Sequence, residues 1–314
     1  MTDKNNFELK WESNHIIGWN LNSLCNFKCV YCFCSTEALS NEHPAVGRYS
    51  SKHIAKAFNE TGLVWRIHMS GGEPFLYPDY INLCKLLSEK HYISINTNLT
   101  TKNVFDFGET INPDKVLSIN AGLHVLEREK HKDGVKKYIE KFNFLKNKGF
   151  EIRSEYVSYP PLFERMKEDI KLLNKNGVEP VNIKIFRGNF EGKHYPEAYS
   201  KDQLEFLRDI MIDTRELKIA NNRFDFYGRR CEAGFRSFNM DAAGNLSRCL
   251  STKRSYGNLF TGNYKFDKKA RPCPLRYCGC PYEGFRLIKE EKASKAETLI
   301  EVLKEKISRK LNKK

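Results

Sequence analysis

Residues 16–32 read IIGWNLNSLCNFKCVYC, an apolar segment that leads directly into three cysteines. The run at 16–21 has the length and the apolar character of a buried β-strand. Cys25, Cys29 and Cys32 follow on one loop, so their thiols can face a common point. Thiolates at this spacing suit soft metal ions or an iron–sulfur cluster. A structural zinc site is the alternative, and it normally needs a fourth ligand, for which Cys34 is the nearest candidate.

The composition indicates a globular protein in a reducing compartment. Apolar residues make up 40% of the 314 residues, which excludes a disordered chain, and no apolar run has the length of a membrane span or a signal peptide. We therefore expect a cytoplasmic protein, in which clustered cysteines are metal ligands or catalytic thiols more often than disulfides. The net charge of +14 is compatible with an anionic substrate or with a lysine-rich background.

Outward from the cysteine loop, predicted strands alternate with predicted helices. Strands are expected at 16–21, 64–69, 92–96, 116–120, 151–157 and 181–186. Helices are expected at 51–59, 78–90, 133–148, 163–176 and 202–213, with a weak one at 101–112. This alternation predicts βα units on a parallel sheet, either doubly wound or a partial barrel. In both cases the loops at the carboxyl ends of the strands form the active face.

Beyond about residue 216 the sequence predicts short, turn-rich strands. They are expected at 224–227, 237–240 and 246–249, with a hairpin turn at 241–245. A last helix begins near Ser294, which forms a capping box with Glu297. It carries one apolar stripe: Leu299, Ile300, Leu303, Ile307 and Leu311. We expect this helix to pack against the barrel with its lysine-rich face in solvent. The chain thus divides into units at 1–215, 216–285 and 286–314.

Two motifs together resemble the signature of the radical S-adenosylmethionine (SAM) superfamily. The first is Cys25-x3-Cys29-x-Tyr31-Cys32, with an aromatic residue before the third cysteine. The second is Met69-Ser70-Gly71-Gly72-Glu73-Pro74 at the end of the next strand, which is similar to the superfamily's Gly-Gly-Glu motif. The resemblance covers about residues 15–190. It implies an α/β fold with a partial (βα)6 barrel that is similar to a TIM barrel.

The resemblance also implies the cofactors and their ligands. Cys25, Cys29 and Cys32 would hold three irons of a [4Fe–4S] cluster, and the fourth iron would bind SAM. The cluster would donate an electron that cleaves SAM to a 5′-deoxyadenosyl radical, so the cofactor carries the difficult chemistry. The electron would come from an external low-potential reductant such as a flavodoxin or a ferredoxin. The residues implied to contact SAM are Tyr31, Gly71, Gly72, Glu73, Asn96 and Asn98. Arg153, whose charge inside a barrel is unusual for a structural core, is a candidate for contact with the SAM carboxylate or with the substrate.

Three residues are candidates for a catalytic role. Glu155 shares a strand face with Arg153 at period two, and such charges inside a barrel are unusual for a structural core. His124 lies on the loop after the fourth predicted strand. It is either an acid–base residue or a loop histidine without a role. Cys34 flanks the cluster loop and is either a hydrogen-atom donor or an inert thiol.

The second group of cysteines contains Cys231, Cys249, Cys273, Cys278 and Cys280. Cys231-x12-Gly244-x4-Cys249 resembles the start of the SPASM/twitch extension, which holds auxiliary iron–sulfur clusters in part of the superfamily. Five cysteines are too few for a full SPASM extension, so the resemblance implies the shorter twitch form with one auxiliary [4Fe–4S] cluster. The spacing of the last three departs from the usual pattern, which leaves their roles open. A structural zinc ribbon is the alternative.

These features predict a radical SAM enzyme that abstracts a hydrogen atom from an unactivated C–H bond, with an auxiliary cluster that assists oxidation or substrate binding. Relatives of this architecture modify peptides, dehydrogenate sugar alcohols or rearrange nucleotides. The short segment before the first strand favours a small molecule over a peptide, and the positive charge favours an anionic one. A peptide-modifying enzyme is the alternative. A non-catalytic iron–sulfur or zinc protein that binds nucleic acid is an alternative of another class, and we expect no membrane partner.

Overall fold

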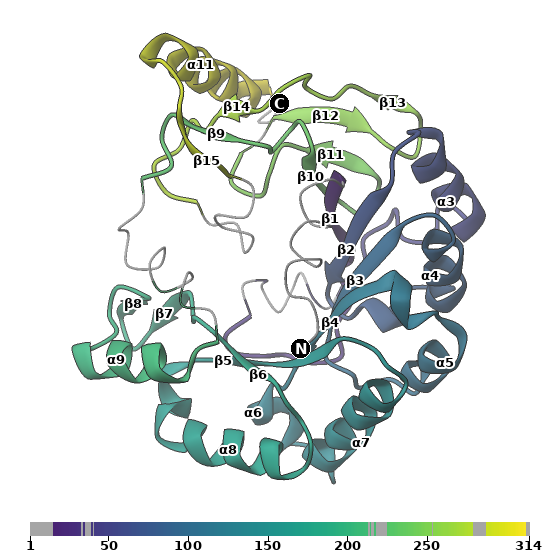
Figure 1. The fold of residues 1–314 in the computed structure, drawn as a ribbon, viewed down its shortest axis with the longest axis vertical. Coiled ribbons are helices and arrows are strands. Elements are labelled where there is room, and N and C mark those ends of the chain that lie inside the picture. The colour runs from purple at the N-terminus through teal and green to yellow at the C-terminus, as the bar shows by residue number, and fades with distance from the viewer. Residues whose placement is uncertain are drawn as a thin grey trace.

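A ten-stranded sheet forms the centre of the molecule (Figure 1). The structure is a computed structural model that describes residues 15–32, 34, 39, 41–212, 214, 217, 225–252, 254–278 and 287–311, with only the backbone at 287–291. The strand order is β13-β12-β11-β10-β1-β2-β3-β4-β5-β6. Over the described residues the sheet is open, because β13 and β6 are its two edges.

Six parallel strands make up one half of this sheet, as the alternating sequence pattern predicts. They are β1 (His15–Asn22), β2 (Trp65–Gly71), β3 (Tyr92–Thr97), β4 (Val116–Gly122), β5 (Ile152–Val157) and β6 (Val181–Lys184). Each pairs in parallel with the next. The connecting helices that cover one face are α3 (Ser51–Glu60), α4 (Tyr80–Ser88), α5 (Asn103–Thr110), α7 (Gly134–Asn147) and α8 (Phe163–Lys175). The predicted α/β fold with a partial (βα)6 barrel is confirmed.

The apolar core lies between the sheet and these helices. Its largest fully buried side chains include Trp19, Phe58, Trp65, Phe107 and Phe142. Side chains alternate along each strand, so the residues between these apolar positions face the other side of the sheet. On β3, for example, Ile93 and Ile95 are buried, whereas Asn96 is exposed. The helix-free face is therefore available for polar side chains.

Several short elements differ from the predicted pattern. The helix expected to start at Pro78 begins at Tyr80, since Asp79 has a left-handed backbone conformation with φ of 56°. A short helix, α6 (Val125–Arg128), follows β4. The long loop after β6 contains a hairpin of β7 (Gly188–Phe190) and β8 (Lys193–Tyr195). The last predicted helix of this half is α9 (Lys201–Ile210).

The C-terminal strands extend the same sheet instead of forming a separate one. β10 (Ser237–Met240) pairs in parallel with β1, and β11 (Asn245–Ser247) returns beside it. The hairpin predicted at 241–245 is thus confirmed, with Gly244 at a φ of 86°. β12 (Ser255–Asn258) and β13 (Asn263–Tyr264) complete this edge. A smaller sheet contains β14 (Arg271–Pro272), β9 (Arg229–Cys231) and β15 (Leu287–Lys292).

The strand predicted at 224–227 is wrong over residues 225–227, which the structure describes. The backbone N–H of Tyr227 donates to Asp225 Oδ1 at 2.9 Å, and Gly228 has a φ of 74°. Asp225 thus supports a local turn, and the strand β9 begins only after it.

The terminal helix, α11 (Lys295–Leu311), has the predicted start but not the predicted orientation. Ser294 Oγ accepts from the backbone N–H of Glu297, whose carboxylate accepts from the backbone N–H of Ser294, so the capping box is confirmed. The five apolar residues of the stripe are 50–68% exposed, whereas Thr298, Glu301 and Glu305 are buried. The expectation that the apolar stripe packs inward is therefore wrong, because ion pairs hold the acidic face against the protein. Among the described helices, α11 included, none is long and apolar enough to cross a membrane.

His91, between α4 and β3, gives the fold a testable pH dependence. Its side chain is buried, and its Nδ1 accepts a hydrogen bond from the backbone N–H of Trp65 at 3.3 Å. Burial, assisted by Lys90 and Lys115, lowers the pKa of His91 from 6.5 to about 4. The unfolded chain therefore takes up this proton first as the pH falls, so the stabilisation is complete above about pH 6.5 and is lost towards pH 4.

We expect His91→Gln to remove a part of the acid sensitivity of folding. In the wild type, His91 is protonated in the unfolded chain at pH 5 but stays neutral in the folded chain. This difference lowers the free energy of unfolding by about 2 kcal/mol between pH 8 and pH 5. Chemical denaturation of iron-free protein at both pH values measures this loss. His43→Gln, at an exposed histidine, is the matched control and should leave the loss unchanged. An equal loss in the free energy of unfolding in wild type and His91→Gln would contradict the prediction, because it would mean that folding does not change the pKa of His91.

Candidate active site

Polar side chains line the face of the sheet that the helices leave open. Asn96 of β3, Asn120 of β4 and Arg153 of β5 occupy neighbouring register positions. The Asn120 amide donates to Asn96 Oδ1 at 2.8 Å. His68 Nδ1 lies 2.5 Å from Ser94 Oγ on the same face. The sheet thus presents a row of hydrogen-bonding groups next to the carboxyl ends of its strands.

The first cysteine group lies on the loop after β1, beside this row. Cys25, Cys29 and Cys32 are each partly buried, and the backbone N–H of Cys32 donates to the carbonyl of Cys29 at 3.0 Å. Burial raises the pKa of Cys29 to about 12, and the negative charges of Glu127, Cys32 and Cys25 add to this effect. The thiols are therefore near enough to one another to interact electrostatically.

Cys34 lies directly beside this group. A hydrogen bond from the Cys34 side chain lowers the pKa of Cys32 to about 6, since it stabilises the Cys32 thiolate. The same contact raises the pKa of Cys34. At neutral pH, Cys32 is thus the more readily ionised thiol of the pair, and the ionised thiol is the form that binds iron.

Gly71 and Gly72 pack against the segment that leads into the cysteines. The backbone N–H of Gly72 donates to the carbonyl of Asn22 at 3.0 Å, and that of Glu73 donates to the carbonyl of Leu24 at 2.8 Å. A Cβ atom on Gly72 would lie 2.1 Å from the carbonyl oxygen of Leu24. This approach of two backbones requires glycine at position 72.

Glu73 fastens its loop to the end of β3. Its fully buried carboxylate accepts from Thr97 Oγ1 at 2.7 Å and from the backbone N–H of Asn98 at 2.6 Å. Burial raises the pKa of Glu73, and these donors oppose the rise. Asn98 in turn directs its amide towards Cys25 Sγ at 3.9 Å and Asn26 Oδ1 at 3.0 Å. The Gly-Gly-Glu loop, β3 and the cysteine loop are therefore joined through Glu73 and Asn98.

Tyr31 and His124 form a stacked pair at the end of β4. The Tyr31 hydroxyl lies 3.3 Å from His124 Nδ1, and the ring centroids are 5.9 Å apart. Burial, assisted by Arg128, lowers the pKa of His124 to about 4, so its imidazole is neutral near pH 7. A Cβ on Gly122 would lie 2.2 Å from His124 Nε2, so glycine at 122 leaves room for the ring. His124 is thus positioned as a neutral partner of Tyr31.

Glu155 faces β6. Its carboxylate accepts from the Asn182 amide at 3.1 Å and pairs with Lys184 Nζ at 3.5 Å. Burial raises the pKa of Glu155, while Lys184 opposes the rise. Arg153 shares the strand face of Glu155, as period two predicts. A basic and an acidic group therefore lie on one strand of the polar face.

Arg128 belongs to this site but was not found from the sequence. Its buried guanidinium donates to the carbonyls of Asn98, Gly122 and Leu123, and it lies 4.2 Å from the centroid of the Tyr138 ring. It therefore holds together the loops that follow β3 and β4. Nothing in the sequence pattern singles it out, because it lies on the four-residue helix α6.

The second cysteine group gathers at the smaller sheet. Cys231 ends β9 and is in register with Arg271 of β14, and Cys273 directly follows β14. Burial raises the pKa of Cys273 to about 11, with contributions from Cys231 and Cys249. These three thiols are thus close enough to interact. Cys278 is partly buried, and Cys280 lies outside the described residues.

Both cysteine groups offer donors of the type that an iron–sulfur cluster needs. In the part of the chain that the structure describes, no three His, Cys, Asp or Glu side chains are arranged around a point that could hold one metal ion. A [4Fe–4S] cluster takes each thiolate on a different iron, so its ligands need not meet at one point. The cysteines of each group are thus donors of the right type for such a cluster, and the described ones are partly buried.

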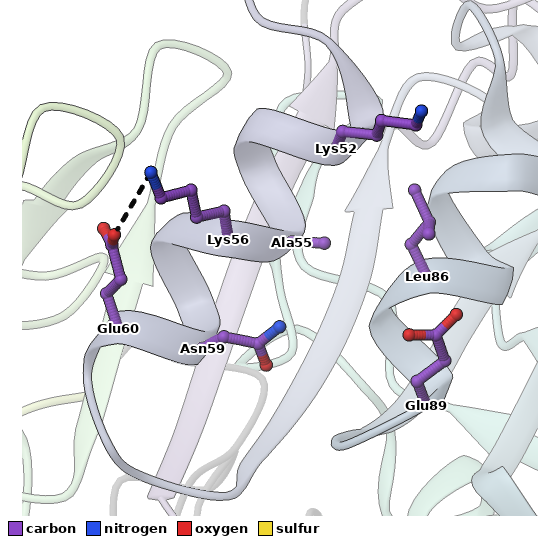
Figure 2. Close-up of a pocket in the computed structure, with 7 residues that line it drawn as sticks. All are labelled: Lys52, Ala55, Lys56, Asn59, Glu60, Leu86 and Glu89. Atoms are coloured by element: carbon purple, nitrogen blue, oxygen red, sulfur yellow. Dashed lines mark ion pairs between the residues drawn. The ribbon is translucent and has the colours of Figure 1, made fainter.

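A depression on the outer surface lies away from these groups. It has a volume of about 490 Å³ and lies between α3 and α4, where Lys56 pairs with Glu60 at 3.6 Å (Figure 2). The helices that line it cover the opposite face of the sheet from the polar row. It contains none of the predicted site residues.

Two curated proteins are similar to parts of this chain. The chain is 32% identical over 110 residues to a probable GTP 3′,8-cyclase of Archaeoglobus fulgidus, which covers 34% of this chain and 35% of the relative. It is 26% identical over 203 residues to a cysteine-type anaerobic sulfatase-maturating enzyme of Clostridium novyi, which covers 60% of this chain and 48% of the relative. The chain thus matches less than half of the length of either protein.

Solved structures share the fold. Streptococcus suis SuiB bound to S-adenosylmethionine aligns with a TM-score of 0.57 and 15% identity, over 79% of this chain and 64% of that chain. The model of the radical SAM superfamily matches residues 19–186, more than half of the chain, and this range contains the first cysteine group and the Gly-Gly-Glu loop. The predicted resemblance is therefore confirmed: the chain belongs to the radical SAM superfamily, and its cofactors are a [4Fe–4S] cluster and SAM.

Proposed function

We propose that this radical SAM enzyme abstracts a hydrogen atom from an unactivated C–H bond of a substrate bound against the polar face of the sheet. The observation that carries the proposal is the placement of Cys25, Cys29 and Cys32 beside that face, on a loop fixed by Asn98. When bound, the cluster and SAM supply a 5′-deoxyadenosyl radical, given an electron from an external low-potential reductant such as a flavodoxin or a ferredoxin.

The residues of the site divide into ligands and positioning groups. Cys25, Cys29 and Cys32 would hold the cluster. Glu73, Asn98 and Arg128 hold the three surrounding loops in place through the hydrogen bonds described above. The groups available to bind SAM are the backbone at Gly71 and Gly72 and the side chains of Tyr31, Asn96 and Arg153. Glu155, His124 and Cys34 remain the candidates for contact with substrate.

An auxiliary [4Fe–4S] cluster at the second cysteine group is the next part of the proposal. Its support is the convergence of Cys231, Cys249 and Cys273, which come from three separate segments of the chain. Cys278 and Cys280 are the candidates for a further ligand. Such a cluster would accept an electron from a substrate radical or bind the substrate. Acceptance of that electron would make the enzyme an oxidoreductase.

A small anionic molecule is the substrate class that the site favours. Arg153 and Lys184 project from β5 and β6 on the polar face, and Glu155 is the acidic group opposite Lys184. The similarity to a GTP 3′,8-cyclase supports an anionic substrate. A peptide is the second candidate, supported by the similarity to the sulfatase-maturating enzyme of Clostridium novyi.

Anaerobic reconstitution tests the proposed function. We expect about eight irons per chain, as two [4Fe–4S] clusters require, and release of 5′-deoxyadenosine when SAM and dithionite are added. Deuterium transfer to 5′-deoxyadenosine from deuterated nucleotides, compared with deuterated peptides, distinguishes the two substrate classes. Four or fewer metal ions without SAM cleavage would instead indicate a non-catalytic metal-binding protein.

A further inference from the structure

Arg248 places a buried positive charge at the second cysteine group. It is 3% exposed and directly precedes Cys249. Its Nε donates to the carbonyl of Ala233 at 3.1 Å, and its Nη2 donates to the carbonyl of Pro272 at 2.9 Å. Pro272 directly precedes Cys273, and Ala233 lies two residues after Cys231. The guanidinium is therefore fixed to backbone next to all three cysteines.

The ion pairs around Arg248 do not cancel this charge. Arg248 pairs with Glu301 of α11 at 3.5 Å, but the same carboxylate also pairs with Arg254 and Lys304, each at 2.9 Å. Arg254 and Arg271 share the second carboxylate, Asp267, at 3.2 and 3.4 Å. This described network thus joins four cations, Arg248, Arg254, Arg271 and Lys304, to two carboxylates, an excess of two positive charges.

Arg248 is the buried cation of this network, with 3% of its side chain exposed, whereas Arg254, Arg271 and Lys304 are 21–40% exposed. A buried cation is unfavourable without a nearby anion. A cluster held by the three cysteines would supply that anion, because Arg248 directly precedes Cys249 and its guanidinium donates to the carbonyl directly before Cys273. Burial acts to lower the pKa of Arg248, whereas the charges of Cys231, Tyr256, Cys273 and Cys249 act to raise it. The interaction is reciprocal, since Arg248 acts to lower the pKa of Cys273. Arg248 and the three thiols therefore form one electrostatic unit.

We propose that Arg248 is a positioning residue that raises the reduction potential of an auxiliary [4Fe–4S] cluster held by Cys231, Cys249 and Cys273. The proposal rests on the auxiliary cluster of the proposed function. Reduction adds a negative charge to a cluster, and a fixed cation nearby stabilises the reduced form more than the oxidised form. Burial strengthens this effect, because little water screens the guanidinium. A higher potential makes the cluster a better acceptor for an electron from the substrate radical that remains after hydrogen-atom abstraction.

A merely structural role predicts a different outcome. Arg248 and Glu301 also join the hairpin of β10 and β11 to α11, so the loss of either side chain breaks the same contact. If this connection is the whole role of Arg248, removal of either side chain lowers the thermal stability. The reduction potential of the auxiliary cluster then does not depend on whether a positive or a negative charge was removed. If the charge acts on the cluster, the two losses shift the potential in opposite directions.

The test uses the full chain with both clusters reconstituted, and compares Arg248→Gln with Glu301→Gln. Redox titration followed by electron paramagnetic resonance measures the midpoint potential of each cluster. At a fixed potential we expect Arg248→Gln to lower the reduced-to-oxidised ratio of the auxiliary cluster at least tenfold, a shift of about 59 mV for a one-electron couple. Glu301→Gln should raise the ratio. Both variants should leave the potential of the first cluster unchanged.

Arg248→Lys keeps the positive charge and loses the forked geometry of the guanidinium. We therefore expect the reduced-to-oxidised ratio of the auxiliary cluster in Arg248→Lys to lie closer to the wild-type ratio than that in Arg248→Gln. Shifts in the same direction for Arg248→Gln and Glu301→Gln, or no shift in either, would overturn the proposal. If Arg248→Gln does not fold, the sign of the Glu301→Gln shift decides the question. Failure of the proposed function has a separate signature, since the wild type would then hold only the irons of the first cluster.

Discussion

Simultaneous replacement of Cys25, Cys29 and Cys32 by alanine is expected to remove about half of the bound iron and to abolish cleavage of SAM. We propose these thiols as the ligands of the cluster that binds SAM, whereas Cys231 and Cys273 of the second group lie at the smaller sheet and Cys249 follows β11. No other described cysteine group adjoins the Gly-Gly-Glu loop. Iron analysis and 5′-deoxyadenosine release in dithionite, on anaerobically reconstituted protein, measure the two effects.

Cys84→Ala is the matched control for this triple variant. Cys84 is buried in α4 among apolar side chains, away from both cysteine groups. Its replacement should leave the iron content and the release of 5′-deoxyadenosine unchanged. Release of 5′-deoxyadenosine by the triple variant would show that the catalytic cluster has been assigned to the wrong cysteines.

Gly72→Ala is expected to have the second largest effect. The new Cβ would lie 2.1 Å from the carbonyl oxygen of Leu24 and 2.7 Å from that of Ser23. Both atoms belong to the backbone just before Cys25, so the overlap is relieved only if the cysteine loop or the Gly-Gly-Glu loop moves. A displacement of about 1 Å at a catalytic centre reduces the rate on the order of 100-fold. We expect a loss of this size in SAM cleavage, with a lower iron content.

Gly62→Ala provides the comparison for this variant. Gly62 has no heavy atom within 4 Å of its ideal Cβ position and lies at the end of α3. Its φ of 71° makes alanine strained by about 1–2 kcal/mol, so the control bears a backbone cost without a steric overlap. SAM cleavage should remain near the wild-type rate. Similar losses in both variants would mean that general destabilisation, and not the contact with Leu24, explains the effect.

The sequence predicted the parallel half of the sheet well, and the physical reason is its periodicity. Strands such as β2 and β3 alternate apolar and polar residues and lie between amphipathic helices, and this periodicity is the primary local signal. The two motifs then placed the cysteine loop and the Gly-Gly-Glu loop at the carboxyl ends of β1 and β2. The roles predicted for individual residues at these loops remain predictions.

Long-range pairing and short elements were beyond the sequence pattern. The pairing of β10 with β1 joins residues more than 200 positions apart, and no local propensity encodes it. Arg128 lies on a helix of four residues, which is too short for a periodic signal. The predicted orientation of α11 was wrong. Hydrophobic periodicity identifies an apolar face, whereas here the buried Arg248 and the partly buried Arg254 pair with Glu301 and hold it inward.

The central claim is that two cysteine groups hold two clusters with separate tasks. The most direct test is the Cys231→Ala, Cys249→Ala double variant, in which iron content and release of 5′-deoxyadenosine are measured on the same reconstituted sample. We expect the iron content to fall by about half while SAM cleavage in dithionite stays close to that of the wild type, because the first cluster takes its electron directly from the reductant. Unchanged iron, or a parallel loss of iron and SAM cleavage, would contradict the account.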